Sequence, residues 1–256
     1  MSICDLENYK QLEQHKHVLL EQFVSPQLLK VLCNYLWFRQ NQQGFKPNDK
    51  RTAFVLSHEP VLDAVLDYFS IVFSQVIGAK LLPTYGFSRI YHKGADLHRH
   101  IDRPACEVSC TFPLGFSDKS DWPIYVAMEK HDEIGQGVNM QLGDMLLYKG
   151  QQLFHWREKL EKDWQAQLFL HFVYADGDNV EHQFDKRGGL LMTLERLNLI
   201  EPQQIDNELE TREVEEQLTD FLNKQLFILK ALHRVKKSLF PSLILIVITS
   251  FLLFFL

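Results

Sequence analysis

His100 and Asp102 place an imidazole and a carboxylate two positions apart in the chain. In an extended strand the side chains at positions i and i+2 point to the same face, so one metal ion could bind both groups. The pair alone is a weak signal, because short motifs recur by chance in a chain with eleven histidines. A third ligand is expected from a later strand, and His155, which follows an apolar segment at 145–148, fits that role.

Two histidines and one carboxylate on one triangular face of a metal ion leave its other positions open. Non-haem iron(II) oxygenases use those positions for oxygen and for a bidentate co-substrate, so the set predicts an iron centre. A structural zinc site that draws on Cys106 and Cys110 is the rival, although buried free cysteines are common. We expect His171, which has apolar neighbours, to be a core histidine, with an orientation toward the cavity as the alternative. We expect His98 to be solvated, with a supporting contact to the metal ligands as the alternative.

The elements that would position these residues change character along the chain. Helical patterns cover 5–43 and 59–77, interrupted by an apolar stretch at 17–24, after which Ser25-Pro26 is a cap followed by a first-turn proline. Later segments are short, rich in β-branched and aromatic residues, and bounded by Gly, Pro and Asp, which is typical of strands. They lie near 81–92, 105–115, 122–129, 138–148 and 165–175. Helices followed by strands predict an α+β domain in which N-terminal helices support a sheet sandwich or barrel.

The order of the motifs resembles a known enzyme family. Residues 94–102 read G-x-x-L-H-x-H-x-D, an apolar strand follows, and G-D-x-L-L-Y at 143–148 precedes the distal His155. Over residues 15–175 this order is similar to that of the iron(II)/2-oxoglutarate dioxygenases, and within them it is closest to the prolyl hydroxylase group. The resemblance implies a double-stranded β-helix (jelly-roll) core behind the N-terminal helices.

The same resemblance implies the contents of the site. His100, Asp102 and His155 would bind Fe(II), and Tyr91 lies where a strand residue commonly contacts the co-substrate 2-oxoglutarate. The implied reaction is hydroxylation of a C–H bond, with ascorbate as a further reductant. The substrate is not visible in the sequence, and a protein side chain is one candidate.

One position departs from the family pattern. These enzymes usually place an Arg or Lys about ten residues past the distal histidine, to pair with the far carboxylate of 2-oxoglutarate, whereas here residues 164–167 read Trp-Gln-Ala-Gln. Arg157 and Arg103 are the substitutes that the sequence offers. The gap keeps two alternatives open: an inactive β-helix that serves as a binding scaffold, and a cupin-like protein that holds a metal without 2-oxoglutarate.

The C-terminal part has a different composition. After the catalytic domain at 1–176 we expect a linker at 177–204, and then an amphipathic helix at 205–237. The apolar seam at 214–235 could pair two copies as a coiled coil or pack back on its own domain. Residues 239–256 carry no charge and follow a basic flank, which predicts a single transmembrane anchor with the catalytic domain on the cytoplasmic side; a buried C-terminal helix is the alternative.

Overall composition sets outer limits on these expectations. A net charge of −6 gives no reason to expect nucleic-acid binding, which requires a basic face. The four cysteines show no framework spacing and the N-terminus has no apolar signal-like run, so we expect the catalytic domain to work in a reducing compartment.

Overall fold

The computed structural model describes residues 3–48 and 50–187. Most of the predicted linker, the amphipathic helix at 205–237 and the membrane segment at 239–256 lie outside the described residues. The statements about the linker, the dimer seam and the anchor therefore stay predictions.

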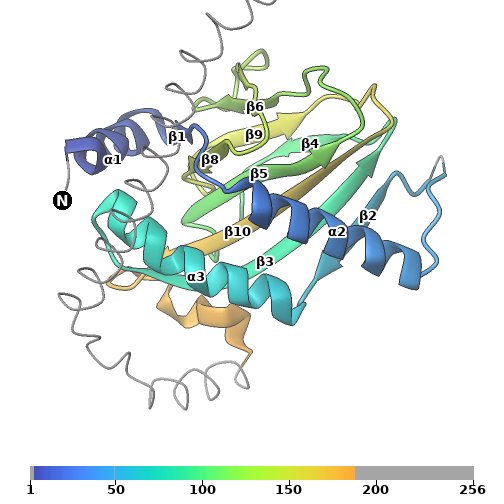
Figure 1. Ribbon diagram of the computed structural model, residues 1–256. Helices are drawn as coiled ribbons and strands as arrows, with labels where there is room; N and C mark the ends of the chain where they lie inside the picture. The colour runs from blue at the N-terminus through green and yellow to red at the C-terminus, as the bar shows by residue number, and fades with distance from the viewer. Residues whose placement is uncertain (1–2, 49, 188–256) are drawn as a thin grey trace, which may run out of the picture. The chain divides into compact units, whose positions relative to one another are not determined.

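The strands of the described residues form two antiparallel sheets (Figure 1). The larger sheet contains β1 (His17–Leu20), β2 (Ala53–Ser57), β3 (Leu81–His92), β5 (Val108–Phe116), β8 (Met145–Tyr148) and β10 (Trp164–Tyr174). The smaller sheet contains β4 (Leu97–His100), β6 (Ile124–Ala127), β7 (Gln136–Val138) and β9 (Phe154–Arg157). Their orders are β1-β8-β5-β10-β3-β2 and β4-β9-β6-β7. From β3 to β10 the chain passes back and forth between the two sheets, except at the β6–β7 pair, as in a jelly roll.

Three α-helices precede or interrupt the first strands. They are α1 (Ile3–His15), α2 (Pro26–Gln42) and α3 (Pro60–Ile77), and a 3₁₀ segment, η1 (Val180–Lys186), follows β10. Helices α2 and α3 lie across the larger sheet (Figure 1). Ser25 Oγ accepts a hydrogen bond from the backbone N–H of Leu28 at the start of α2, and Gly78 ends α3 with a left-handed φ of 66°, so both predicted boundaries are confirmed.

The two faces of β10 explain where a site can form. Leu168, Leu170 and Phe172 belong to the main apolar core that the larger sheet shares with α2 and α3. Because side chains alternate along a strand, Gln167 and His171 point the opposite way, into the space between the sheets. Both are buried, so the interior of the sandwich contains polar groups and not only apolar packing.

Helix α3 is the one described helix that is long and apolar enough to cross a membrane by length and composition. Its Leu66, Phe69 and Phe73 are at most 3% exposed and lie in the main core. This burial is the behaviour of a core helix that supports a sheet.

The strand pattern was predicted with errors. Strands β2, β4 and β9 fall outside the five segments that were predicted as strands, although His100 and His155 were themselves expected on strands. The single strand expected near 138–148 is two strands, β7 and β8, separated by a turn in which Gly143 has φ 103°, a conformation that favours glycine.

Candidate metal centre

The three predicted ligands meet at one end of the space between the sheets. His100 ends β4 and is the direct cross-strand partner of His155 in β9, while Asp102 follows in the next loop. The Nε2 atoms of the two histidines each lie 3.6 Å from Asp102 Oδ1. One ligand atom from each residue lies within 4.8 Å of the others. The structure thus brings the predicted set together; that the set binds iron stays a prediction.

Backbone contacts orient both imidazoles for ligation. His100 Nδ1 lies 2.7 Å from the carbonyl oxygen of His98, and His155 Nδ1 lies 3.0 Å from that of Leu153. A carbonyl only accepts, so each Nδ1 carries the proton and donates it, which leaves an unprotonated Nε2 facing Asp102. Such second-shell hydrogen bonds are how proteins orient metal-binding histidines.

The charge state of the cluster also suits a cation. Burial by itself would raise the pKa of Asp102, but the neighbouring His100, His171 and His155 hold that pKa well below its usual range. Burial lowers the pKa of His155, while the neighbouring carboxylate of Asp102 raises the pKa of His100. One carboxylate and two imidazole lone pairs form a mixed oxygen and nitrogen donor set of the kind that binds Fe(II), so the residues fit that ion.

Asp102 is held by two neighbours that the sequence did not reveal. Its backbone N–H donates to the carbonyl of Gly150 (2.9 Å), and its Oδ2 accepts from Ser109 Oγ (3.0 Å). A Cβ on Gly150 would collide with Asp102 Oδ2 and would lie 2.7 Å from Ser109 Oγ. Only a glycine allows this close approach, which leaves Oδ1 directed at the histidines.

His171 is buried as expected, but it also faces the site. Its Nδ1 lies 2.8 Å from Ser109 Oγ, and its Nε2 has no hydrogen-bond partner within the described part of the chain. Together with Asp102 and Cys106 it forms a second group of potential ligands. Cys110 is in neither group found among the described residues and lies in the main core, so the geometry gives no support to the zinc site of Cys106 and Cys110.

A cavity of about 160 Å³ opens beside the three ligands. At roughly 30 Å³ per water molecule, it has room for about five waters or one small organic acid. Tyr91, the predicted co-substrate contact, lines this cavity. The sequence interpretation missed Arg89, which also lines it; the signal was its position two residues before Tyr91, which places both on one face of β3.

The two arginines proposed from the sequence lie elsewhere. Arg157 is 2% exposed, donates from Nη1 to the carbonyl of Trp122 (2.5 Å), and is not among the residues that line the cavity. Burial lowers its pKa to about 10, and its Nε and Nη2 atoms find no acceptor among the described residues. Arg103 is 45% exposed at its side chain and pairs with Asp185 at 2.8 Å. That either arginine binds 2-oxoglutarate stays a prediction.

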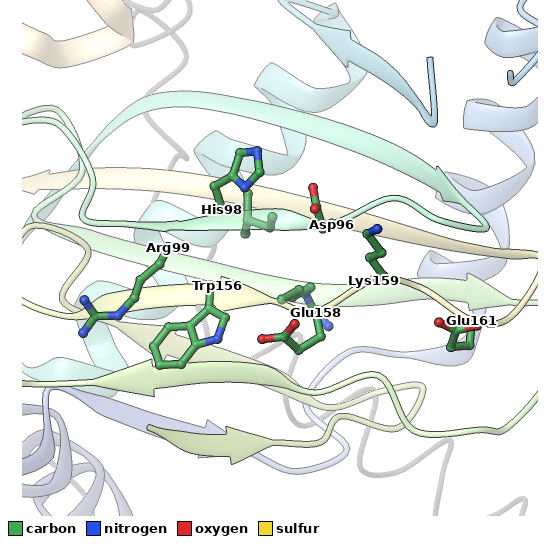
Figure 2. Close-up of a pocket in the computed structure, with 9 residues that line it drawn as sticks. Asp96, His98, Arg99, Trp156, Glu158, Lys159 and Glu161 are labelled. Carbon is green, nitrogen blue, oxygen red and sulfur yellow. The ribbon is translucent and has the colours of Figure 1, made fainter. Parts of the chain in front are cut away.

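A second, wider pocket of about 590 Å³ lies along β4 and β9 (Figure 2). The side chains that border it carry both signs of charge, and they include the exposed His98. None of the three metal-ligand candidates lines this pocket. His98 is therefore solvated, as predicted, and contributes to the site only through its backbone carbonyl.

Comparison with known proteins finds similar folds among solved structures. No family model and no curated protein sequence matches the chain. A Pseudomonas putida prolyl-4-hydroxylase is 14% identical, with a TM-score of 0.52 over 65% of this chain and 98% of that one. A 2OG-Fe(II) oxygenase family oxidoreductase from Burkholderia pseudomallei is 14% identical, with a TM-score of 0.51 over 68% and 92%. HygX from Streptomyces hygroscopicus, solved with nickel and 2-oxoglutarate, is 11% identical, with a TM-score of 0.53 over 66% and 87%.

These likenesses define the class of the fold. The described part of the chain has the double-stranded β-helix of the 2-oxoglutarate oxygenases, and the prediction of a jelly roll is confirmed. At such low identity the likeness concerns the fold, so the activity has to be argued from the site.

Proposed function

We propose that the protein is an Fe(II)/2-oxoglutarate-dependent oxygenase that hydroxylates its substrate. The observation that carries the proposal is the convergence of two histidine Nε2 lone pairs and one ionised carboxylate from separate segments, beside a small cavity. The fold supports it, because its solved neighbours include a prolyl-4-hydroxylase and an oxidoreductase of the 2OG-Fe(II) oxygenase family.

The chain's own residues would hold the metal ion and limit the access of water to the cavity. His100, Asp102 and His155 would bind iron, which together with 2-oxoglutarate and oxygen supplies the oxidising chemistry. Ser109 and Gly150 keep the carboxylate in place. The cavity wall is largely aromatic; Tyr148 lies against His155 with ring centroids 4.9 Å apart, which limits the access of water.

A binding scaffold without activity is the second candidate. The observation that favours it is Gln165, a neutral residue at the position ten past the distal histidine where the resemblance leads one to expect a cation. A cupin-like metal protein would share the metal site but would not bind 2-oxoglutarate.

One set of measurements separates these candidates. Full-length protein is loaded anaerobically with Fe(II), and conversion of 2-oxoglutarate to succinate is followed by NMR in air. We expect iron-dependent succinate formation, which His155→Ala abolishes together with iron content, whereas His131→Ala, at an exposed histidine outside the ligand set, leaves both unchanged. Iron binding without binding or turnover of 2-oxoglutarate would reject the oxygenase and favour the scaffold or the cupin.

We further propose that residues 239–256 anchor the protein in a membrane. Their lack of charge and the basic residues before them support this. Ile246→Arg would place a charge near the middle of the segment, at a cost of roughly 3 kcal/mol, and is expected to move the protein from the membrane to the soluble fraction. Alkaline extraction that releases the wild-type protein would reject the anchor.

A further inference from the structure

Strand β3 contributes a positively charged side chain to the cavity wall, and this residue is not part of the family pattern. Tyr85, Phe87, Arg89 and Tyr91 occupy alternate positions of the strand, and all four line the cavity. Within the set of lining residues Arg89 is the only arginine or lysine, and Asp102 is the only carboxylate. A ligand that enters beside the metal ligands therefore meets one positive side chain.

Arg89 has no anionic partner in the described structure. Its Nη1 donates a long hydrogen bond to the hydroxyl of Tyr91 (3.4 Å), and its guanidinium carbon lies 5.4 Å from the ring centroid of Phe87. Its Nε is buried without an acceptor. No carboxylate of residues 3–48 and 50–187 lies within 4.0 Å of it.

Of the seven arginines in the described residues, three pair with an acidic side chain, and Arg99 and Arg157 donate to backbone carbonyls; Arg89 has neither kind of partner. Arg39, Arg103 and Arg187 each form an ion pair at 2.6 to 2.8 Å with an acidic side chain. A guanidinium that is partly removed from water and left without an anion loses solvation, and here only the long hydrogen bond to Tyr91 and the neighbouring ring of Phe87 offset that loss. An anionic ligand in the cavity would supply the missing partner of Arg89.

The strand register relates Arg89 to the departure from the family pattern. Gln165 and Gln167 on β10 lie directly opposite Tyr91 and Arg89 on β3. They are the residues ten and twelve positions past His155, in the region where the resemblance leads one to expect the basic residue. Cross-strand neighbours are about 5 Å apart at Cβ, so a cation on β3 reaches nearly the same space as one on β10.

We propose that Arg89, with the hydroxyl of Tyr91, binds the far carboxylate of 2-oxoglutarate in place of the cation that β10 lacks. This inference rests on the proposed function. Arg157 is a less suitable partner because it donates to the carbonyl of Trp122 and does not line the cavity. Its charge lies close to Tyr91 and Tyr148 and adds a positive potential behind the cavity wall.

The proposal predicts selectivity for a dicarboxylic 2-oxo acid. A guanidinium binds a carboxylate through parallel hydrogen bonds but gains nothing from a methyl group. The discriminating pair is 2-oxoglutarate and 2-oxopentanoate, which share five carbons and differ only in that the latter ends in methyl. The contribution of Arg89 should appear with the first acid and vanish with the second.

The test is calorimetric titration of both acids into full-length protein loaded with Mn(II) under anaerobic conditions. We expect the wild-type protein to prefer 2-oxoglutarate, and Arg89→Gln to lower that affinity roughly 100-fold while the affinity for 2-oxopentanoate stays the same. Arg89→Lys should recover part of the loss, since it keeps the charge without the fork. Arg51→Gln, at an exposed arginine, is the matched control and should bind as the wild type does.

The outcomes separate the two proposals. If the Mn(II)-loaded wild-type protein binds neither acid, the proposed function fails. If the wild type prefers 2-oxoglutarate and Arg89→Gln keeps the full preference, the assignment of Arg89 is wrong; a loss confined to Arg157→Gln would then move the role to Arg157. Mn(II) affinity and the unfolding temperature, unchanged in Arg89→Gln, show that its loss is not one of folding. Should Arg89→Gln not fold, the comparison rests on Arg89→Lys, where an unaltered preference overturns the proposal.

Discussion

Gly150 provides the most direct test of how the carboxylate ligand is positioned. In Gly150→Ala the new methyl group would collide with Asp102 Oδ2 and would lie 2.7 Å from Ser109 Oγ and 2.8 Å from the carbonyl oxygen of Cys106. These neighbours would have to retreat by roughly 0.5 Å or more to restore ordinary contacts. They cannot separate freely, because the Asp102 N–H donates to the Gly150 carbonyl at 2.9 Å.

The expected size of the effect follows from this geometry. Overpacking in a close-packed interior costs about 1–3 kcal/mol of stability, and loss of a contact that orients a metal ligand weakens metal binding roughly 10- to 100-fold. We therefore expect Gly150→Ala to unfold at a lower temperature and to bind Co(II) at least 10-fold more weakly. Titration followed by the visible absorption of Co(II) measures the affinity and reports the ligand geometry.

Gly137→Ala is the matched control, since its added Cβ would meet the nearest atom at 3.4 Å, an ordinary contact, in strand β7. It should bind Co(II) as the wild type does. A Gly150→Ala protein with wild-type affinity and an unaltered Co(II) spectrum would show that Asp102 does not depend on this close approach, and the reasoning would be refuted.

Three further outcomes are expected. Ser109→Ala removes the donor to Asp102 Oδ2 and should weaken Co(II) binding about 10-fold; unchanged affinity would count against its orienting role. In the metal-free protein, burial lowers the pKa of His171 to about 4, so below about pH 6.5 the unfolded chain takes up a proton that the folded chain does not. Stability should then fall by roughly 2 kcal/mol between pH 7 and pH 5, and urea titrations of His171→Asn should lack this part of the loss. Leu66→Ala, at a fully buried position of α3, should cost roughly 3 kcal/mol without changing Co(II) affinity, and a parallel loss of affinity would contradict the separation of core and site.

The sequence predicted correctly those elements whose ends or burial are marked by nearby residues. Ser25-Pro26 and Gly78 mark helix ends by capping chemistry, and the apolar run of β10 predicted a strand buried on both faces. Strand β2 was missed because its pairing with β3 is set by tertiary contact and not by its short pattern. The turn around Gly143 was missed because alternating apolar residues on both sides masked it.

The site was predictable only in part, for a related reason. The ligand candidates are chemically distinctive residues in a recognisable order, and Tyr91 followed from the resemblance. Gly150, Ser109 and Arg89 are common residue types whose roles come from what lies opposite them in space. Register and the alternation of side chains, which become known only with the sheet pairing, are what bring these three residues to the site.

Strand β4 lies at the edge of the smaller sheet and, among the strands that the structure describes, pairs with β9 alone. Since His100 is on β4 and His155 is on β9, an ion bonded to both would cross-link an edge strand to its single neighbour. Because the ion would bind only while β4 and β9 are paired, the free energy of metal binding would add to the free energy needed to open this strand pair. Iron depletion would loosen this rim of the sheet first, and faster amide exchange along β4 would report the loss of the ion before the main core unfolds.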